Sequence, residues 1–587
     1  MNSPINNTVA NGLNMDADKY SREYQIRLTG GMALVTIAKN FGVTQAFGLS
    51  SGKLSPVFKA LSETPEIGYV GVRHEAAASF MATAIAARTG AVALCLGETG
   101  PGGVNLLSGL AGAFANNLPV LAVTSSNPSI MTAPDLGAFA SSDNLGLFSH
   151  LTKWNARVTD IRRVPSLVRQ ALQTAVSGRP GPVHLDIPAD ILSQTHLFDR
   201  QELQAPLPLP SPRADAATLD EAARRLQAAE RPLVIAGGGL VRAQGADVLR
   251  ALIDRTDWPV TTTQMGMGLI ASDDPRLIGQ GGVIGGPAVL RALREADVVL
   301  ALGCRFSSWL WTDPPYGWKA SPEQQLIHVD LDPGVIGKVR PATLGVVGDA
   351  RIFVENLIER LEPTHAPRPW TQDLSDERDR HRAKLNQLAA RPATSAGLHP
   401  AALAQRIGQA VGDQDLVVFD GGHTSFWSND FTPALTPRTR FHEPGMTHLG
   451  FGLPWAIALK RAEPARAVWC LTGDGAMGFT IQELDTARRE GLPIVVVVHN
   501  NAAFGVIGFA QSRGGFSFGA DLADTDYAAI ARGFGCFGER VTTLEAFDEA
   551  LSRALASGLP AVLDVRVIFD PHPQMPAFGK STAGTSH

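Results

Sequence analysis

The chain has 587 residues, 44% apolar and 18% charged, so it is long and apolar enough for about three globular domains. Its formal net charge of -5 comes from mixed-sign stretches without a Lys/Arg block, which argues against nucleic acid or an anionic membrane and favours small-molecule partners. Four scattered cysteines, a polar N-terminus and no run of ~18 apolar residues indicate no disulfide framework, zinc site, signal peptide or membrane span, so we expect a cytoplasmic protein.

Short β-branched runs alternate with helix-length amphipathic stretches along the chain. In order they are "AVALCLG", "PVLAVTSS" and "GPVHLDIP", then "PLVIAGGG", "DVVLALG" and "LIHVDLD", then "DLVVFDGG", "AVWCLTGDG", "PIVVVVHNN" and "AVLDVRVIF". Continuous apolar strands between helices are typical of parallel sheets covered on both faces. Connectors rich in Pro and charge, 199–217 and 361–397, separate three groups of runs. We therefore predict three consecutive doubly wound α/β domains over 25–198, 215–362 and 398–572.

The stretch "LTGDGAMGFTIQELDTARREGLPIVVVVHNNAAFG" places a carboxylate and an amide at the exits of two predicted strands. We expect strands over 467–472 and 492–498 with a helix over 479–490, so that Asp474 and Asn501 converge at one sheet edge. A carboxylate, an amide oxygen and a backbone carbonyl suit Mg²⁺ that bridges a diphosphate. The residues alone also fit a helix N-cap and a solvated Asn-Asn turn. The strand-helix-strand spacing favours the metal site.

This block resembles the cofactor-binding signature of thiamine-diphosphate enzymes. The first group of runs is similar to the pyrimidine-binding domain of the acetolactate synthase, pyruvate oxidase and benzaldehyde lyase group at "FGLSSGKLSPVFKAL", "VRHEAAASFMATAIAARTG", "GETGPGGVNLLSGLAGAFANNLPVLAVTSS", "LTKW" and "GRPGPVHLDIPAD". The second is similar to the non-catalytic middle domain of that group at "RPLVIAGGGLVR", "DVVLALGCRFSSW" and "LIHVDLDP". The resemblance extends over about 28–570 and implies pyrimidine-binding, middle and diphosphate-binding domains, in that order.

The resemblance implies thiamine diphosphate and Mg²⁺ as cofactors and assigns roles to residues. Glu75 would hydrogen-bond the pyrimidine ring, so that the amine of the cofactor acts as a base; by itself it also fits an exposed helix start. Leu449 would support the bent cofactor where relatives commonly have Met, with core packing as the alternative. The implied metal ligands are Asp474, Asn501 and the carbonyl of Ala503, and the implied diphosphate or pyrimidine contacts are Gly422, His423, Gly475, Ala476 and Met477.

Several positions depart from particular relatives and bear on the substrate. Ala140 follows Phe139 where relatives have a glutamine. The chain has no His-His pair of the pyruvate decarboxylase kind, and Ile507 stands where those enzymes place a glutamate that protonates the reaction intermediate. We therefore expect carboligase or lyase chemistry on a 2-oxo acid or 2-hydroxy ketone, with a simple decarboxylase and a catalytically silent relative as alternatives. Gly52 and Lys53 occupy the loop that faces the substrate in relatives, where Lys53 fits either contact with a carboxylate or phosphate or a solvated loop position.

The middle domain and the assembly are less defined by the sequence. The glycine run "AGGGLVRAQG" follows a strand, but relatives use this domain for FAD, for ADP or for nothing, so FAD is compatible and not predicted. Glu75 and Asp474 lie on different domains. In the resembling family the pyrimidine domain of one subunit meets the diphosphate domain of another, which implies a homodimer or a homotetramer.

Overall fold

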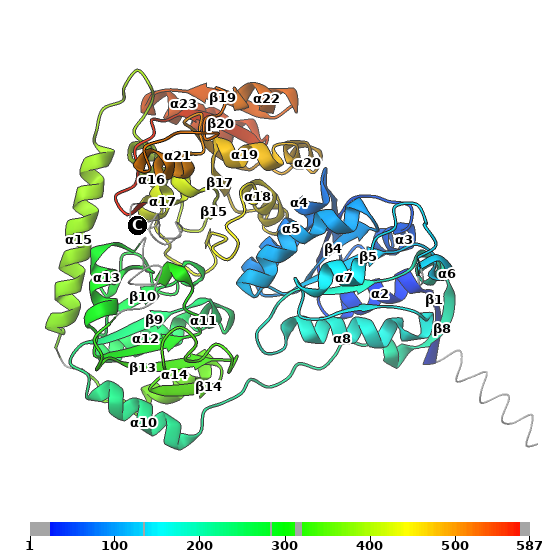
Figure 1. The fold of residues 1–587 in the computed structure, drawn as a ribbon, viewed down its shortest axis with the longest axis horizontal. Helices are drawn as coiled ribbons and strands as arrows, with labels where there is room; N and C mark the ends of the chain where they lie inside the picture. Colours follow the sequence, from blue (N-terminus) through cyan, green and yellow to red (C-terminus); the bar gives the residue numbers. More distant parts are fainter. Residues whose placement is uncertain (1–23, 133–134, 282–284, 311–319, 365, 576–587) are drawn as a thin grey trace, which may run out of the picture. The chain divides into compact units, whose positions relative to one another are not determined.

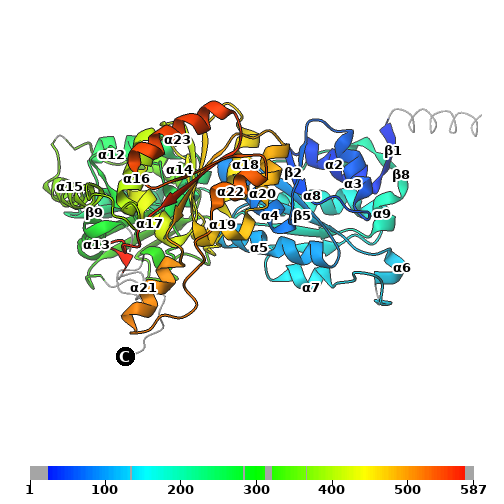
Figure 2. The same ribbon diagram turned by 90° about the horizontal axis from the view of Figure 1, so that it is seen from above.

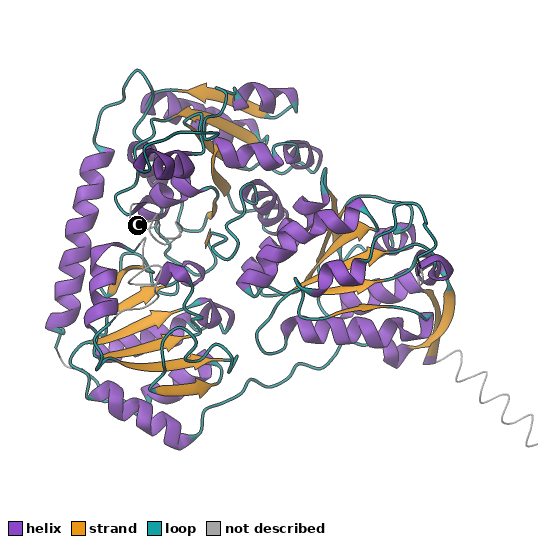
Figure 3. Ribbon diagram, viewed as in Figure 1, coloured by secondary structure: helices purple, strands orange, loops and turns teal. Residues whose placement is uncertain are grey.

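The chain folds as two compact units, Met1–Leu209 and Pro210–His587. The computed structural model describes residues 24–132, 135–281, 285–310, 320–364 and 366–575. Figures 1 and 2 show the ribbon from two directions, and Figure 3 distinguishes its helices from its strands. Within these described ranges, no helix is long and apolar enough to cross a membrane.

The first unit is built on a six-stranded parallel sheet with the order β3-β2-β4-β5-β7-β6. Its strands are β2 (Gln45–Gly48), β3 (Gly68–Gly71), β4 (Ala93–Glu98), β5 (Val120–Ser125), β6 (Asn155–Arg157) and β7 (Val183–Asp186). Its helices are α2 (Gly30–Asn40), α3 (Ser55–Ser62), α4 (Glu75–Thr89), α5 (Pro101–Asn116), α6 (Ser129–Thr132), α7 (Asn144–Ser149), α8 (Val164–Val176) and α9 (Ala189–Ser193). An antiparallel pair, β1 (Gln25–Thr29) and β8 (Thr195–Asp199), joins the two ends of the unit.

Helices α4 and α5 pack together unusually closely in the first unit. Small residues permit this approach, because a Cβ atom added at Gly109 would lie only 2.4 Å from the Oγ of Ser79. Helix α4 begins at Glu75 after the N-cap His74, whose side chain accepts a hydrogen bond from the backbone of Ala76. The start of α4 is therefore fixed beside α5.

The second unit begins with a six-stranded parallel sheet ordered β11-β10-β9-β12-β13-β14. Its strands are β9 (Pro232–Ala236), β10 (Val260–Thr262), β11 (Leu277–Gln280), β12 (Val298–Leu302), β13 (Gln325–Asp330) and β14 (Leu344–Val347). Its helices are α10 (Ala216–Gln227), α11 (Gly238–Arg242), α12 (Ala246–Thr256), α13 (Gly286–Glu295) and α14 (Ala350–Ile358). The glycine run leads into α11, where a Cβ at Gly237 would lie 2.2 Å from the carbonyl oxygen of Gly303, so that backbone packs directly on backbone.

The second unit ends with another six-stranded parallel sheet, ordered β16-β15-β17-β18-β20-β19. Its strands are β15 (Leu416–Phe419), β16 (Arg440–Phe441), β17 (Val468–Gly473), β18 (Val495–Asn500), β19 (Phe537–Val541) and β20 (Ala561–Arg566). Its helices are α16 (Pro400–Ala410), α17 (Gly422–Phe431), α18 (Gly452–Ala462), α19 (Asp474–Thr480), α20 (Glu483–Arg489), α21 (Gly505–Arg513), α22 (Tyr527–Gly533) and α23 (Leu544–Ser557).

A long helix, α15 (Pro369–Ala389), occupies most of the second predicted connector. Although its sequence is highly charged, the helix has buried apolar residues. Trp370 and Leu374 pack in the apolar cluster of the middle sheet, and Leu385 packs with Trp427 of α17. This helix was not predicted from the sequence, because Pro and charged residues dominate the composition of 361–397. The helix links the two sheets of the second unit.

The predicted fold class is confirmed, since three parallel six-stranded sheets follow one another with helices on their faces. The strands predicted over 467–472 and 492–498 are β17 and β18. The helix predicted over 479–490 begins earlier, at Asp474, and is divided into α19 and α20. An acidic residue in the first turn of α19 is favoured by the helix dipole. The limits of the three domains stay a prediction.

Candidate active site

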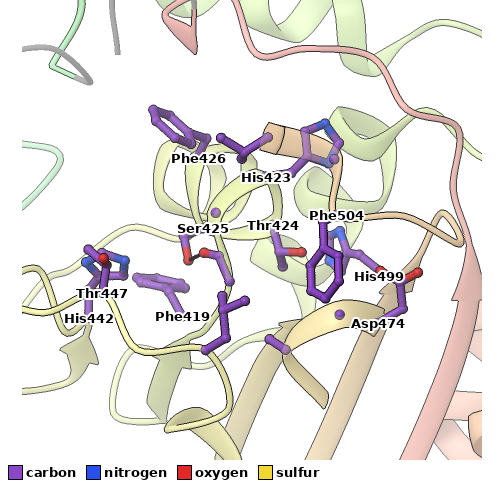
Figure 4. A pocket seen from close by; sticks show the side chains of 18 of the residues that line it. Phe419, His423, Thr424, Ser425, Phe426, His442, Thr447, Asp474, His499 and Phe504 are labelled. Atoms are coloured by element: carbon purple, nitrogen blue, oxygen red, sulfur yellow. Dashed lines mark hydrogen bonds between the residues drawn. The ribbon is translucent and has the colours of Figure 1, made fainter. Parts of the chain in front are cut away.

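A pocket of about 270 Å³ lies in the second unit, at the carboxyl ends of β15, β17 and β18. Loops and helix starts gather at this edge of a parallel sheet, and their backbone N–H groups are available to ligands. Figure 4 shows side chains that line the pocket, among them Phe419, His423, Asp474, His499 and Phe504.

Asp474 stands where β17 ends and α19 begins, and its residue surface is only 3% exposed. Its Oδ2 accepts a hydrogen bond of 3.1 Å from the backbone N–H of Ala503, and its carbonyl accepts one of 2.8 Å from the Tyr527 hydroxyl. Burial raises the pKa of Asp474 to about 6. The carboxylate is therefore fixed at the strand exit, and its hydrogen bonds do not fully offset the cost of burying its charge.

The loop after β18 brings the second predicted ligand into the same pocket. Asn501 and Ala503 both line it. Between them, Ala502 has a φ of 55°, in the left-handed region that non-glycine residues rarely adopt. This turn places the loop against Asp474, as the Ala503 hydrogen bond shows.

Helix α17 begins at the pocket with Gly421 as its N-cap, which has a φ of 84° and provides no side-chain cap. Gly422 and His423 follow and line the pocket. His423 is tied to the C-terminal segment, because its Nε2 lies 2.7 Å from the carbonyl oxygen of Asp570. Burial lowers the pKa of His423 to about 4. The uncapped helix start has the character of an anion site.

Leu449 lines the pocket, and the loop that carries it is hydrogen-bonded to a buried carboxylate. The Asp420 carboxylate accepts hydrogen bonds from the backbone N–H groups of Gly450, at 3.1 and 3.2 Å, and of Gly452, at 3.0 Å. Burial raises the pKa of Asp420 to about 7. Asp420 thus acts on the pocket through the loop and positions Leu449.

A second buried carboxylate, Glu443, organises the other side of this loop. It accepts backbone hydrogen bonds from Met446 at 2.9 Å and His448 at 3.1 Å, and it lies 3.4 Å from the Nδ1 of His448. Burial alone would raise the pKa of Glu443, but the hydrogen bonds of His448 and Met446 bring it below the usual value. Both Glu443 and His448 line the pocket.

His499 lies at the second-last position of β18 and lines the pocket. It is 2% exposed, and neither ring nitrogen has a hydrogen-bond partner within the described part of the chain. Burial lowers the pKa of His499 to about 3, so the ring is neutral at physiological pH. A neutral imidazole keeps one N–H donor and one acceptor nitrogen.

Glu75 belongs to the first unit and is oriented by a neighbouring helix. Its Oε2 accepts a hydrogen bond of 2.9 Å from the Nδ2 of Asn105 in α5. A Cβ atom at Gly102 would lie 3.4 Å from Oε1, so the glycine leaves room for the carboxylate at the helix start. The side chain is partly buried.

Lys53 forms a partly buried ion pair in the first unit, which was not predicted from the sequence. Its Nζ lies 3.2 Å from the Oε1 of Glu98, and its backbone N–H donates to Oε2 at 3.3 Å. Burial would raise the pKa of Glu98, but hydrogen bonds from Ser51 and Lys53 bring it below the usual value. Gly52 is exposed, and Ala140 has a φ of 53°.

The structure gathers most of the predicted second-unit residues in one pocket. Its lining includes Gly422, His423, Leu449, Asp474, Gly475, Ala476, Asn501, Ala503 and Ile507. Met477 is 1% exposed and does not line the pocket. The remaining predicted residues, Glu75, Gly52, Lys53 and Ala140, lie in the first unit.

Sequence reasoning missed three supporting residues. Asn105 was present in the quoted motif "GETGPGGVN", but nothing in the motif indicates that its amide reaches Glu75. His499 gave the clearest signal, as the first polar residue after the apolar run "PIVVVV". Asp420 gave none, because its partners Gly450 and Gly452 are far away in the sequence.

The pocket fits a diphosphate held by Mg²⁺. The uncapped start of α17 offers N–H groups to an anion, and Asp474, with Asn501, offers the oxygen ligands that Mg²⁺ prefers. The buried imidazole of His499 adds a polar group whose nitrogens lack partners in the described residues. Within the described ranges, no three His, Cys, Asp or Glu side chains cluster as a metal site; the predicted set needs only one carboxylate.

Three models of one enzyme family match the chain. The N-terminal TPP binding domain of thiamine pyrophosphate enzymes matches residues 28–146, the central domain matches 219–357, and the C-terminal TPP binding domain matches 420–565.

Curated relatives match over nearly the whole length. The chain is 32% identical over 558 residues to an acetolactate synthase of Mycobacterium bovis, covering 92% of this chain and 88% of the relative. It is 30% identical over 552 residues to the acetolactate synthase large subunit of Corynebacterium glutamicum, covering 92% and 86%. A probable acetolactate synthase large subunit of Methanocaldococcus jannaschii is 29% identical over 573 residues, covering 94% and 95%.

Proposed function

Because the chain belongs to the thiamine-diphosphate enzymes of the acetolactate synthase type, we propose that it makes or breaks a carbon–carbon bond beside a carbonyl group. The substrate would be a 2-oxo acid or a 2-hydroxy ketone. Mg²⁺ would accompany the cofactor. The main support for this proposal is that Asp474 and the 501–503 loop meet beside the uncapped start of α17 in one pocket.

In the proposed site, Asp474, Asn501 and the carbonyl of Ala503 would hold Mg²⁺, and the start of α17 would hold the diphosphate. Leu449 would support the cofactor, and Asp420 would keep Leu449 in place through its hydrogen bond with the Gly450 N–H. When bound, thiamine diphosphate supplies a nucleophilic carbon and an electron sink.

Glu75 is the proposed catalytic carboxylate. It would share a proton with the pyrimidine nitrogen and so set the protonation state of the cofactor amine. Asn105 fixes the orientation of the carboxylate, because its amide occupies Oε2 at 2.9 Å. The other oxygen, Oε1, would then face the cofactor with its position already defined.

Lys53 supports an acidic substrate. Its ammonium nitrogen is buried and makes no well-aligned hydrogen bond within the described residues, although Glu98 lies 3.2 Å away. A substrate carboxylate near Gly52 and Lys53 would accept a hydrogen bond from this ammonium group. Recognition of a 2-oxo acid by this loop is therefore part of the proposal.

A simple 2-oxo acid decarboxylase is the second candidate, and one observation favours it. The missing His-His pair and Ile507 in place of a glutamate favour carboligation, yet His448 also lines the pocket with Glu443 beside its Nδ1. A histidine held in this way is a competent proton donor. The pocket thus retains a group that could protonate an intermediate and release an aldehyde.

Product analysis separates the candidates. The purified enzyme, loaded with thiamine diphosphate and Mg²⁺, is incubated with pyruvate with and without an added aldehyde. We expect a hydroxyketone product with the aldehyde, or a 2-hydroxy-3-oxo acid from pyruvate alone. Free acetaldehyde alone would establish a decarboxylase, and no turnover on a panel of oxo acids and hydroxyketones would favour a silent relative.

The proposal includes a homodimer or homotetramer, as the family resemblance implies. Light scattering coupled to gel filtration measures the mass directly, against a chain mass of 62.2 kDa. A monomer under all conditions would contradict it.

A further inference from the structure

His499 lies on β18 between Val565 of β20 on one side and β17 on the other. In the parallel pairing of β17 and β18 it stands opposite Gly473, which has no side chain. In the view of Figure 4 its ring lies between His423 and Asp474, beside the ring of Phe504. All four residues line the pocket.

The two histidines of this pocket differ in what they already bind. The Nε2 of His423 lies 2.7 Å from the Asp570 carbonyl and 3.1 Å from the indole nitrogen of Trp427. His499 has neither ring nitrogen paired within the described residues, although it is 98% buried. Buried polar groups in proteins are almost always satisfied, so an unpaired one facing a pocket indicates a missing partner.

The chemistry of the surroundings identifies that partner as an anion rich in acceptor oxygens. The first N–H groups of α17 carry no side-chain cap, and Gly421 and Gly422 let a ligand approach the backbone closely. Asp474 also lines the pocket, but within the described residues neither ring nitrogen of His499 is hydrogen-bonded to it. A diphosphate offers oxygens to both the helix start and the ring.

We propose that His499 donates its ring N–H to a diphosphate oxygen of the cofactor, as a binding residue in addition to the helix start and the metal. This inference rests on the proposed function. It assigns a role to a position of this chain that is otherwise part of an apolar strand, and it predicts that the pocket favours the diphosphate group itself over thiamine without phosphate.

The test compares cofactor-free wild type with His499→Leu and His499→Asn by calorimetric titration and thermal shift. The probes are thiamine diphosphate with Mg²⁺ and inorganic pyrophosphate with Mg²⁺. We expect His499→Leu to weaken both by about 10- to 100-fold, as loss of a hydrogen bond to a charged group does. His499→Asn, which keeps an N–H donor, should recover part of that loss.

Apo stability provides a second readout that a merely structural role would not produce. Since His499→Leu removes an unsatisfied buried polar group, its cofactor-free melting temperature should equal or exceed that of wild type. The matched control is His328→Leu in the middle sheet, where the buried ring pairs with the Cys304 carbonyl at 2.9 Å. His328→Leu should melt earlier and keep wild-type affinity.

The outcomes separate this inference from the proposed function. If wild type binds neither probe, the proposed function fails and the role of His499 fails with it. If wild type binds and His499→Leu binds both probes equally well, only the inference is overturned. Equal losses in the Leu and Asn variants would also overturn it, because they would indicate shape rather than donation.

Discussion

The side-chain amide of Asn105 donates a 2.9 Å hydrogen bond to Oε2 of Glu75, from the second turn of one helix to the first residue of its neighbour. The close packing of α4 against α5 makes this contact available. Oε2 of Glu75 is therefore already hydrogen-bonded within the protein. The other carboxylate oxygen keeps a defined direction at the start of α4.

Replacing Glu75 by Gln should reduce kcat by about 10²- to 10⁴-fold while the cofactor still binds, because the amide cannot share the proton. Steady-state kinetics and calorimetric titration check the two halves of this prediction. Glu66→Gln is the matched control, since Glu66 is an exposed partner of Lys39. Wild-type turnover in Glu75→Gln would remove this residue from the mechanism.

Replacing Asp474 by Asn should weaken magnesium-dependent binding of thiamine diphosphate by at least about 100-fold, because the divalent cation loses its only anionic protein ligand in the proposed set. Titration with and without EDTA measures the effect. Asp485→Asn, in the exposed Asp485–Arg489 pair of α20, serves as control. Binding by Asp474→Asn that is as tight and as EDTA-sensitive as in wild type would refute the metal assignment.

Asp420 should make the cofactor-free enzyme less stable as the pH rises. Burial raises its folded-state pKa from 3.8 to about 7, so between these values the native state binds more protons than the unfolded state. Stability is therefore lost as pH increases through this window. Asp420→Asn cannot ionise and should show a smaller decrease in melting temperature between pH 4.5 and 7.5.

Scanning calorimetry of both proteins at several pH values isolates Asp420, since every other titrating group is common to the two. Parallel curves for wild type and Asp420→Asn would contradict the raised pKa. The variant should also lose turnover if the Gly450 and Gly452 hydrogen bonds position Leu449, because an amide is a weaker acceptor than a carboxylate.

Replacing Lys53 by Met should raise KM for a 2-oxo acid by about 10-fold with a smaller change in kcat, because a charge-assisted contact to the substrate is lost. Lys59→Met is the control, since Lys59 of α3 is 69% exposed and pairs with Glu63, the C-cap residue of that helix. Kinetics with pyruvate and with a neutral hydroxyketone test the assignment. An equal change for both substrates would argue against recognition of the acid group.

Mixing subunits tests whether Glu75 and Asp474 act from different chains, as the family resemblance implies. Glu75→Gln and Asp474→Asn homo-oligomers should each be inactive. After mild dissociation and reassociation, mixed oligomers should regain activity, because one combination restores both wild-type residues. Mixed oligomers verified by native mass spectrometry that stay inactive would place both residues of a site in one chain.

Much of the fold could be predicted because its signals are local. Apolar strands such as Val495–Asn500 are buried along their whole length, and this continuous pattern indicates a parallel sheet before any contact is known. The same rule placed Asp474 and Asn501 at one sheet edge, where both line the pocket. Helix α15 was missed because its few buried residues are spread among charges.

By itself, then, the sequence determined three parallel sheets and the strand exits at which Asp474 and Asn501 stand, since strand periodicity and chain direction are encoded within each segment. Only the tertiary structure joined Asn105 to Glu75 and left His499 buried opposite Gly473. Those relationships depend on how closely separate elements approach, and packing distances between distant segments are properties of the assembled core.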